Sequence, residues 1–187
     1  MIACEQWSYR YPGAKEAAFP ALTGTLGLPG EVSLICGATG SGKSTVLKGF
    51  GGILRPLFGG FESGSLRADR ESIALVPQCS EDRHLCDTPR EEASVSGHFA
   101  GLDRRETFAR WDRIVEELSL QGLERRPFRV LSGGQRKKMA VALGLVRDPR
   151  ILLLDEPLTQ LDPNERMAMV SWLDGVRRIR KIGRAHV

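Results

Sequence analysis

A glycine-rich segment at residues 37–45, Gly-Ala-Thr-Gly-Ser-Gly-Lys-Ser-Thr, constrains the fold more than any other stretch of this chain. It fits the pattern G-x-x-x-x-G-K-[ST], in which backbone N–H groups surround the phosphates of a nucleotide. The pattern needs a strand before the loop and a helix after it, because the helix N-terminus directs its positive dipole end at the phosphates. The apolar run at 32–36 predicts that strand, and residues 43–48 predict that helix.

A second buried strand is predicted at residues 151–154, Ile-Leu-Leu-Leu, which is typical of a strand covered on both faces in a parallel sheet. Asp155 and Glu156 follow it directly. Ligands of open α/β sheets bind at the carboxyl ends of the strands, where Asp155 can hold a magnesium ion directly or through water. A plain loop with two acidic residues is the alternative interpretation of this strand end.

Length and composition limit the class of protein. The chain has 187 residues, of which 41% are hydrophobic and 27% charged, as is ordinary for one globular domain. No apolar run approaches the roughly 20 residues that cross a bilayer, and no secretory signal is visible at the N-terminus. We therefore expect a cytosolic chain.

Charge and cysteine usage exclude two further classes. The net charge is +4, but the basic residues are dispersed and not interleaved with aromatic residues, so no nucleic-acid partner is expected. Cys4, Cys36, Cys79 and Cys86 show neither a C-x-x-C pair nor histidines at zinc spacing, which predicts reduced structural thiols.

The remaining patterns predict alternating strands and helices. The expected elements are short antiparallel strands within 1–31, a strand at 71–76 that ends at Pro77-Gln78, a helical insert at 88–122, a helix at 131–146 opened by Ser132, and a helix at 163–181.

The segment Leu131-Ser132-Gly133-Gly134-Gln135 precedes the strand that carries the two carboxylates. Together with the glycine-rich loop and Asp155-Glu156, it makes the chain resemble the ATP-binding cassette (ABC) family of ATPases from Tyr9 to Asp162. The resemblance implies an α/β fold, the P-loop NTPase cassette of ABC type, with a central, mainly parallel sheet, a small antiparallel β subdomain and a helical subdomain at about 85–147. It also implies ATP and Mg²⁺ as cofactors.

The resemblance also assigns roles to residues. The ATP-binding loop is Gly37, Ala38, Thr39, Gly40, Ser41, Gly42, Lys43, Ser44 and Thr45. Lys43 is expected to reach the outer phosphates, and the expected magnesium ligands are Ser44, Gln78 and Asp155. Glu156 is expected to polarise the attacking water, so the expected catalytic residues are Glu156, Lys43 and Gln78.

Three further positions match the family pattern. Tyr11 matches the aromatic residue that stacks on adenine, with a core or turn tyrosine as the alternative. Residues 131–135 match the signature segment, whose helix N-terminus binds the γ-phosphate of ATP held by a second subunit. Asp162 matches the D-loop aspartate that communicates between two sites, although Leu158-Thr159-Gln160 departs from the usual Thr-Ser-Ala before it.

The end of the chain departs from the family pattern. That pattern continues past Asp162 through a helix into another core strand with a switch histidine, and we expect this chain to lack those last core strands. Residues 182–187, Ile-Gly-Arg-Ala-His-Val, resemble the translation of a sequencing adapter, so we interpret 1–181 as a truncated single domain with a non-native tail. His186 is not assigned as the switch histidine. A natural basic tail is the alternative.

The segment at 78–88 resembles the one after the Q-loop glutamine in energy-coupling-factor importers of vitamins and metal ions. We therefore predict an ATP-hydrolysing subunit of an ABC transporter on the cytoplasmic face of the membrane. Its expected partners are membrane-spanning subunits and a second ABC ATPase subunit. The alternatives are an ABC ATPase with a non-transport task, such as one on the ribosome, and an inactive nucleotide-binding fragment.

Overall fold

The computed structural model describes residues 1–28, 30–78, 84–180 and 183–186. The chain divides into two compact units. The first unit comprises residues 1–75, 150–155 and 182–187, and the second comprises 76–149 and 156–181. The domain limits predicted from the sequence stay predictions.

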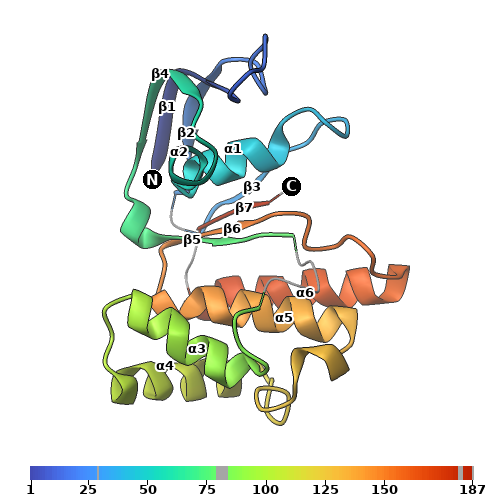
Figure 1. Cartoon of the computed structure of the whole chain (residues 1–187). Helices are drawn as coiled ribbons and strands as arrows, with labels where there is room; N and C mark the ends of the chain where they lie inside the picture. Colours follow the sequence, from blue (N-terminus) through green and yellow to red (C-terminus); the bar gives the residue numbers. More distant parts are fainter. Residues whose placement is uncertain (29, 79–83, 181–182, 187) are drawn as a thin grey trace. The chain divides into compact units, whose positions relative to one another are not determined.

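An antiparallel sheet forms the first layer of the first unit (Figure 1). Its strands lie in the order β2-β1-β4, with β1 at Ile2–Arg10, β2 at Leu22–Leu26 and β4 at Phe61–Ala68. A bulge interrupts β1 near Gln6, opposite Gly64, where an added Cβ would lie 2.1 Å from the Gln6 carbonyl oxygen. The structure confirms the predicted antiparallel strands before residue 31, whereas β4 was not predicted.

A second sheet in this unit has the order β3-β7-β6-β5. Its strands are β3 at Val32–Leu34, β5 at Ile73–Val76, β6 at Ile151–Leu154 and β7 at Gly183–His186. Strand β6 is buried at every residue, as its uninterrupted apolar sequence predicts, and it pairs in parallel with β7. Asp155 therefore follows directly from the carboxyl end of a central strand.

The apolar core of the first unit joins both sheets to helix α1, Lys43–Phe50. The indole of Trp7 on β1 stacks on Phe50 of α1 at 5.5 Å between ring centroids, and Ile151 of β6 belongs to the same core. Each large side chain buried in this way contributes roughly 1.5–3 kcal/mol to folding. The short helix α2, Leu54–Phe58, follows α1 and was not predicted. This packing fixes the start of α1 next to the glycine-rich loop.

The prediction that no core strand follows the last helix is wrong. Strand β7 lies between β3 and β6 and pairs in parallel with both. The prediction required an apolar run, but a parallel ladder is built from backbone N–H and C=O groups, which residues 183–186 supply whatever their side chains. The interpretation of residues 182–187 as non-native stays a prediction.

The second unit is helical (Figure 1). Its helices are α3 at Pro89–Phe99, α4 at Arg104–Glu117, α5 at Gly133–Gly144 and α6 at Pro163–Arg180. They confirm the predicted helical insert and the two predicted helices that follow it. Among the described residues, no helix combines the length and the apolar character needed to cross a bilayer.

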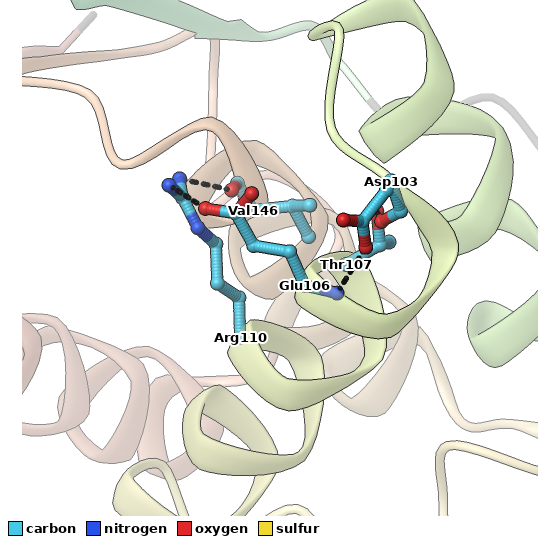
Figure 2. Close-up of polar contacts among 5 residues, drawn as sticks. All are labelled: Asp103, Glu106, Thr107, Arg110 and Val146. Atoms are coloured by element: carbon cyan, nitrogen blue, oxygen red, sulfur yellow. Dashed lines mark hydrogen bonds and ion pairs between the residues drawn. The ribbon is translucent and has the colours of Figure 1, made fainter.

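Caps define where these helices begin. Thr88 precedes α3 and forms a reciprocal capping box with Glu91, and Pro89 fits the first helical position because its missing N–H needs no partner. Asp103 caps α4 by accepting a hydrogen bond from the backbone N–H of Glu106 at 2.7 Å (Figure 2). Such caps typically contribute about 1 kcal/mol each.

Short 3₁₀ turns change two predicted boundaries. Turn η1, Arg70–Ser72, shortens the strand predicted at 71–76, and η3, Leu145–Arg147, ends the helix predicted at 131–146. Turn η2, Phe128–Val130, precedes the signature segment.

The Arg110 side chain of α4 donates two hydrogen bonds, which Figure 2 shows. One goes to Glu106 at 2.6 Å and the other to the Val146 carbonyl of η3 at 3.5 Å. This side chain therefore connects α4 to turn η3, which follows α5.

Candidate active site

The glycine-rich loop of the first unit has the predicted strand–loop–helix form between β3 and α1. Gly42 caps α1 in the left-handed region at φ +88°, and an added Cβ there would lie 2.2 Å from the Ala18 carbonyl oxygen. Because glycine has no side chain to cap the helix, the first-turn N–H groups of α1 stay available for an anion. The backbone of this loop is therefore suited to hold phosphates.

Lys43, the first residue of α1, bends back over the loop. Its Nζ donates hydrogen bonds to the carbonyl oxygens of Gly37 and Ala38, both at 3.0 Å. Both acceptors are neutral dipoles, so a phosphate oxygen would be a stronger partner for the ammonium group. The structure thus places the cation of Lys43 at the loop that the sequence predicts to bind ATP.

Ser44 and Asp155 are in contact although 111 residues separate them in sequence. The Ser44 hydroxyl donates a hydrogen bond to Asp155 Oδ1 at 2.9 Å. The Asp155 side chain is only 6% exposed. A hydroxyl and a carboxylate are hard oxygen donors of the kind that magnesium prefers. Among the described residues, no group of three or more His, Cys, Asp or Glu is placed to hold a metal.

Tyr11 lies against the same helix. Its hydroxyl is 3.1 Å from the Thr45 Oγ1, and its ring packs edge-on against Tyr9 at 4.9 Å and against Phe58 at 5.9 Å. These contacts give the side chain a packing role in this unit. Its predicted stacking on adenine stays a prediction.

Glu156 belongs to the second unit and is held by side chains of that unit. Gln78 Nε2 donates to Glu156 Oε2 at 3.1 Å, and the Thr159 hydroxyl donates to the same oxygen at 2.9 Å. The structure therefore brings together two of the three predicted catalytic residues, Gln78 and Glu156. The contact of Thr159 was missed, although the sequence had marked residues 158–160 as a departure from the family pattern.

The signature segment of the second unit opens α5. Ser132 accepts a hydrogen bond from Gln135 N at 3.2 Å, and Gln135 Oε1 accepts one from Ser132 N at 3.0 Å, which completes a capping box. Leu131 is buried, whereas Ser132 and Gly133 are exposed, and an added Cβ on Gly133 would meet nothing within 4 Å. The segment thus presents an exposed helix N-terminus, the positive end of the helix dipole.

Asp162 has a structural role at the start of α6. Its Oδ1 accepts a hydrogen bond from Glu165 N at 2.8 Å, and Glu165 Oε2 accepts one from Asp162 N at 3.2 Å. This reciprocal pair fixes the first turn of the helix. The predicted role of Asp162 in communication between two sites stays a prediction.

The segment that resembles the importers lies partly outside the described residues, because only 78 and 84–88 of it are described, and Cys79 falls in the gap. His84 stacks on Phe128 with 3.5 Å between ring centroids. Burial is the main cause that lowers the pKa of His84, so its imidazole is neutral at pH 7. Burial also raises the pKa of the Cys86 thiol, with the nearby Glu92 carboxylate adding to the effect.

The family model described as "ABC transporter" matches residues 26–159 of this chain. The chain belongs to the ABC transporter family. This match confirms the predicted family and fold class, because the matched region holds the glycine-rich loop, the signature segment and the two carboxylates.

Two curated ABC relatives show the same similarity. The cobalt import ATP-binding protein CbiO of Rhodobacter capsulatus is 35% identical over 187 residues, which is 95% of this chain and 66% of that protein. The energy-coupling factor transporter ATP-binding protein EcfA of Methanococcus maripaludis is 34% identical over 143 residues, which is 72% of this chain and 51% of that protein. The chain thus spans between half and two thirds of the length of these relatives.

A solved structure supports the assignment of the fold. CbiO1 from Clostridium perfringens, described as part of the ABC transporter complex CbiONQ, superposes with a TM-score of 0.82 and 27% sequence identity. The match covers 99% of this chain and 76% of that one. The α/β cassette predicted from the motifs is therefore confirmed as the fold of this chain.

Proposed function

We propose that this chain is the ATP-hydrolysing part of an ABC importer subunit that powers uptake of a vitamin or a metal ion. The observation that carries the proposal is the Ser44–Asp155 pair beside the glycine-rich loop, which joins a phosphate-binding helix start to a buried carboxylate. The relatives named for cobalt import and for energy-coupling factor transport support the importer class.

ATP would bind with its phosphates against the loop at 37–45 and the first turn of α1. Lys43 would exchange its two carbonyl partners for phosphate oxygens, which are charged and therefore stronger acceptors. Magnesium would be held by Ser44 and Asp155, with Gln78 as the further proposed ligand, and when bound it neutralises charge on the phosphates. Gly42 lets the loop pass close to the Ala18 carbonyl oxygen, an approach that an added Cβ would prevent.

Glu156 would accept a proton from the attacking water as a general base. The two donors on Oε2, Gln78 and Thr159, fix the direction of the carboxylate. A positioned base of this kind typically contributes about 10²–10⁴ in rate. Binding of ATP and activation of the water would thus be carried out mainly by different residues, with Gln78 proposed to take part in both.

A second cassette would complete the reaction. The exposed start of α5 would approach the γ-phosphate of ATP bound by the partner, because a helix N-terminus attracts anions. Asp162 would lie close to that junction. The membrane-spanning subunits would hold the pair at the cytoplasmic face of the membrane and select the transported substrate.

The test uses the full-length protein in inside-out membrane vesicles that contain its partner subunits. We expect ATP hydrolysis that requires Mg²⁺, and ATP-dependent movement of Co²⁺ or of one of a panel of vitamins. A matched preparation with Glu156→Gln provides the inactive control. Hydrolysis without movement of any of these solutes would contradict the importer role, whereas absence of hydrolysis from the wild-type protein would contradict the enzymatic role.

A further inference from the structure

We propose that Thr159 and Lys137 are positioning residues for the carboxylate of Glu156, and that they connect this carboxylate to helix α5. The inference rests on the proposed function, because it assumes that Glu156 activates water. It concerns only contacts within the second unit.

The backbone around Glu156 has an uncommon conformation. Glu156 has a φ of +50° and Gln160 a φ of +62°, so two residues that carry a Cβ lie in the left-handed region. Thr159 N donates to the Glu156 carbonyl oxygen at 3.3 Å, which closes a turn between them. Strained backbone of this kind persists only where surrounding contacts over-determine it, and it gathers at functional sites.

The Glu156 carboxylate receives both of its hydrogen bonds on one oxygen. The Thr159 hydroxyl donates to Oε2 at 2.9 Å and Gln78 Nε2 donates to it at 3.1 Å. Within the described part of the chain, Oε1 accepts no hydrogen bond. The two donors thus hold the carboxylate in place while its other oxygen keeps its lone pairs for a water molecule.

Lys137 ties Thr159 to the signature helix. It lies in the second turn of α5, its side chain is only 9% exposed, and its Nζ donates to the Thr159 carbonyl oxygen. An ammonium group that is buried to this extent needs hydrogen-bond acceptors, and the Thr159 carbonyl oxygen is one of them. Thr159 is therefore held at its carbonyl by α5 and holds Glu156 with its hydroxyl.

This pair of contacts provides a route from the signature segment to the base. Ser132 opens α5, and Lys137 follows five residues later on the same rigid helix. A shift of α5 would move the Thr159 carbonyl and, through the turn, the hydroxyl that holds Glu156. The direction of the carboxylate would thus depend on the position of the signature helix.

The experiment compares Thr159→Val and Thr159→Ser in the full-length protein, with kcat and KM for ATP measured separately. Valine keeps the β-branched shape of threonine but removes the hydroxyl, whereas serine keeps the hydroxyl. We expect kcat to fall about tenfold in Thr159→Val, to stay within about twofold of wild type in Thr159→Ser, and KM to stay within about twofold in both.

A second pair of variants tests the connection to α5. Lys137→Met removes the donor to the Thr159 carbonyl and should lower kcat about tenfold, and Lys137→Arg should restore part of it. The matched control is Lys138→Met on the same helix, because the Lys138 ammonium lies over the Trp172 ring, 5.5 Å from its centroid. This control is expected to keep the wild-type kcat.

The outcomes separate this inference from the proposed function. A wild-type kcat in Thr159→Val, in a protein that Glu156→Gln inactivates, would overturn the inference and leave the proposed function standing. Equal loss in Thr159→Val and Thr159→Ser would also overturn it. A wild-type protein that does not hydrolyse ATP would contradict the proposed function instead. Should Thr159→Val not fold, Thr159→Ala makes the same comparison.

Discussion

The two carboxylates that follow β6 are neighbours in sequence but are held in different ways. Asp155 lies in the first unit, where it is buried beside Ser44 at the start of α1. The neighbouring loop is rich in glycine. Glu156 lies in the second unit and is held by the side chains of Gln78 and Thr159. The difference teaches that the proposed phosphate-binding loop depends on close backbone packing, whereas the position of the proposed base depends on a few replaceable hydrogen bonds.

This comparison predicts which substitutions lower ATP affinity and which lower turnover. Changes at closely packed positions of the glycine-rich loop, such as Gly42, should weaken ATP binding, because an added side chain there would displace the backbone. Changes around Glu156 or the signature segment should lower turnover and spare binding. The predictions below, in order of decreasing effect, would break this division if they failed.

Ser132→Arg should give the largest effect, a loss of hydrolysis of about 10³-fold or more. The bulky cation would block the approach of the α5 N-terminus to the partner's γ-phosphate, while ATP binding by a single chain stays within about threefold. Phosphate release and equilibrium ATP binding are measured on the same full-length preparation.

The control for this variant is Ser132→Ala, which removes the cap of α5 without adding bulk and costs about 1 kcal/mol of stability. Hydrolysis that persists in Ser132→Arg would contradict a shared site between two cassettes. Equal loss of hydrolysis in both variants would assign the effect to the cap instead.

Gly42→Ala should weaken ATP binding by about 10²-fold. The added methyl would lie 2.2 Å from the Ala18 carbonyl oxygen at a φ of +88°, so the loop must move out of its phosphate-binding form. At 1.4 kcal/mol for each factor of ten, this corresponds to about 3 kcal/mol, which is within reach of backbone strain. Isothermal titration with ATP measures it.

The matched control is Gly13→Ala, which has a similar φ of +76° but open space around the added Cβ. It should cost only the strain of the left-handed region, about 1–2 kcal/mol of stability, and leave ATP affinity unchanged. Equal loss of affinity in both variants would contradict the role of close packing at Gly42.

The smallest predicted effect concerns His84, whose pKa is lowered by burial against Phe128. The unfolded chain then binds a proton at this histidine more readily than the folded chain does. The free energy of unfolding should therefore keep its full value above pH 6.5 and decrease as the pH falls below it. His84→Phe keeps the ring stack but cannot titrate, so it should reduce this pH dependence. Chemical denaturation at pH 7.5 and 5.5 measures the difference.

Only part of this architecture can be predicted from sequence. Strand β6 and the loop before α1 could be predicted from their local sequence. An uninterrupted apolar run is typical of a buried parallel strand, and the glycine pattern is typical of a phosphate-binding loop. The start of α5 follows from the capping box of Ser132 and Gln135. Strand β4 was missed because its sequence, Phe-Glu-Ser-Gly-Ser-Leu-Arg-Ala, has weak strand propensity, and its pairing with β1 forms the strand.

The candidate site was predictable to a similar degree. The family pattern named Gln78 and Glu156 before any geometry was known, and the structure brings them into contact. The contact between Lys137 and Thr159 could not be predicted. It joins two residues that are 22 positions apart in sequence, and no local pattern specifies a hydrogen bond from a side chain to a distant carbonyl oxygen. Such contacts depend on how α5 packs against the turn after β6.

The most direct test of the division between binding and turnover is to measure ATP affinity and phosphate release for wild type and Glu156→Gln on the same full-length preparation. The account predicts that the affinity stays within about threefold while kcat falls by about 10²–10⁴. Unchanged turnover in Glu156→Gln would remove Glu156 from the role of base. A parallel loss of affinity would contradict the separation of the two sets of residues.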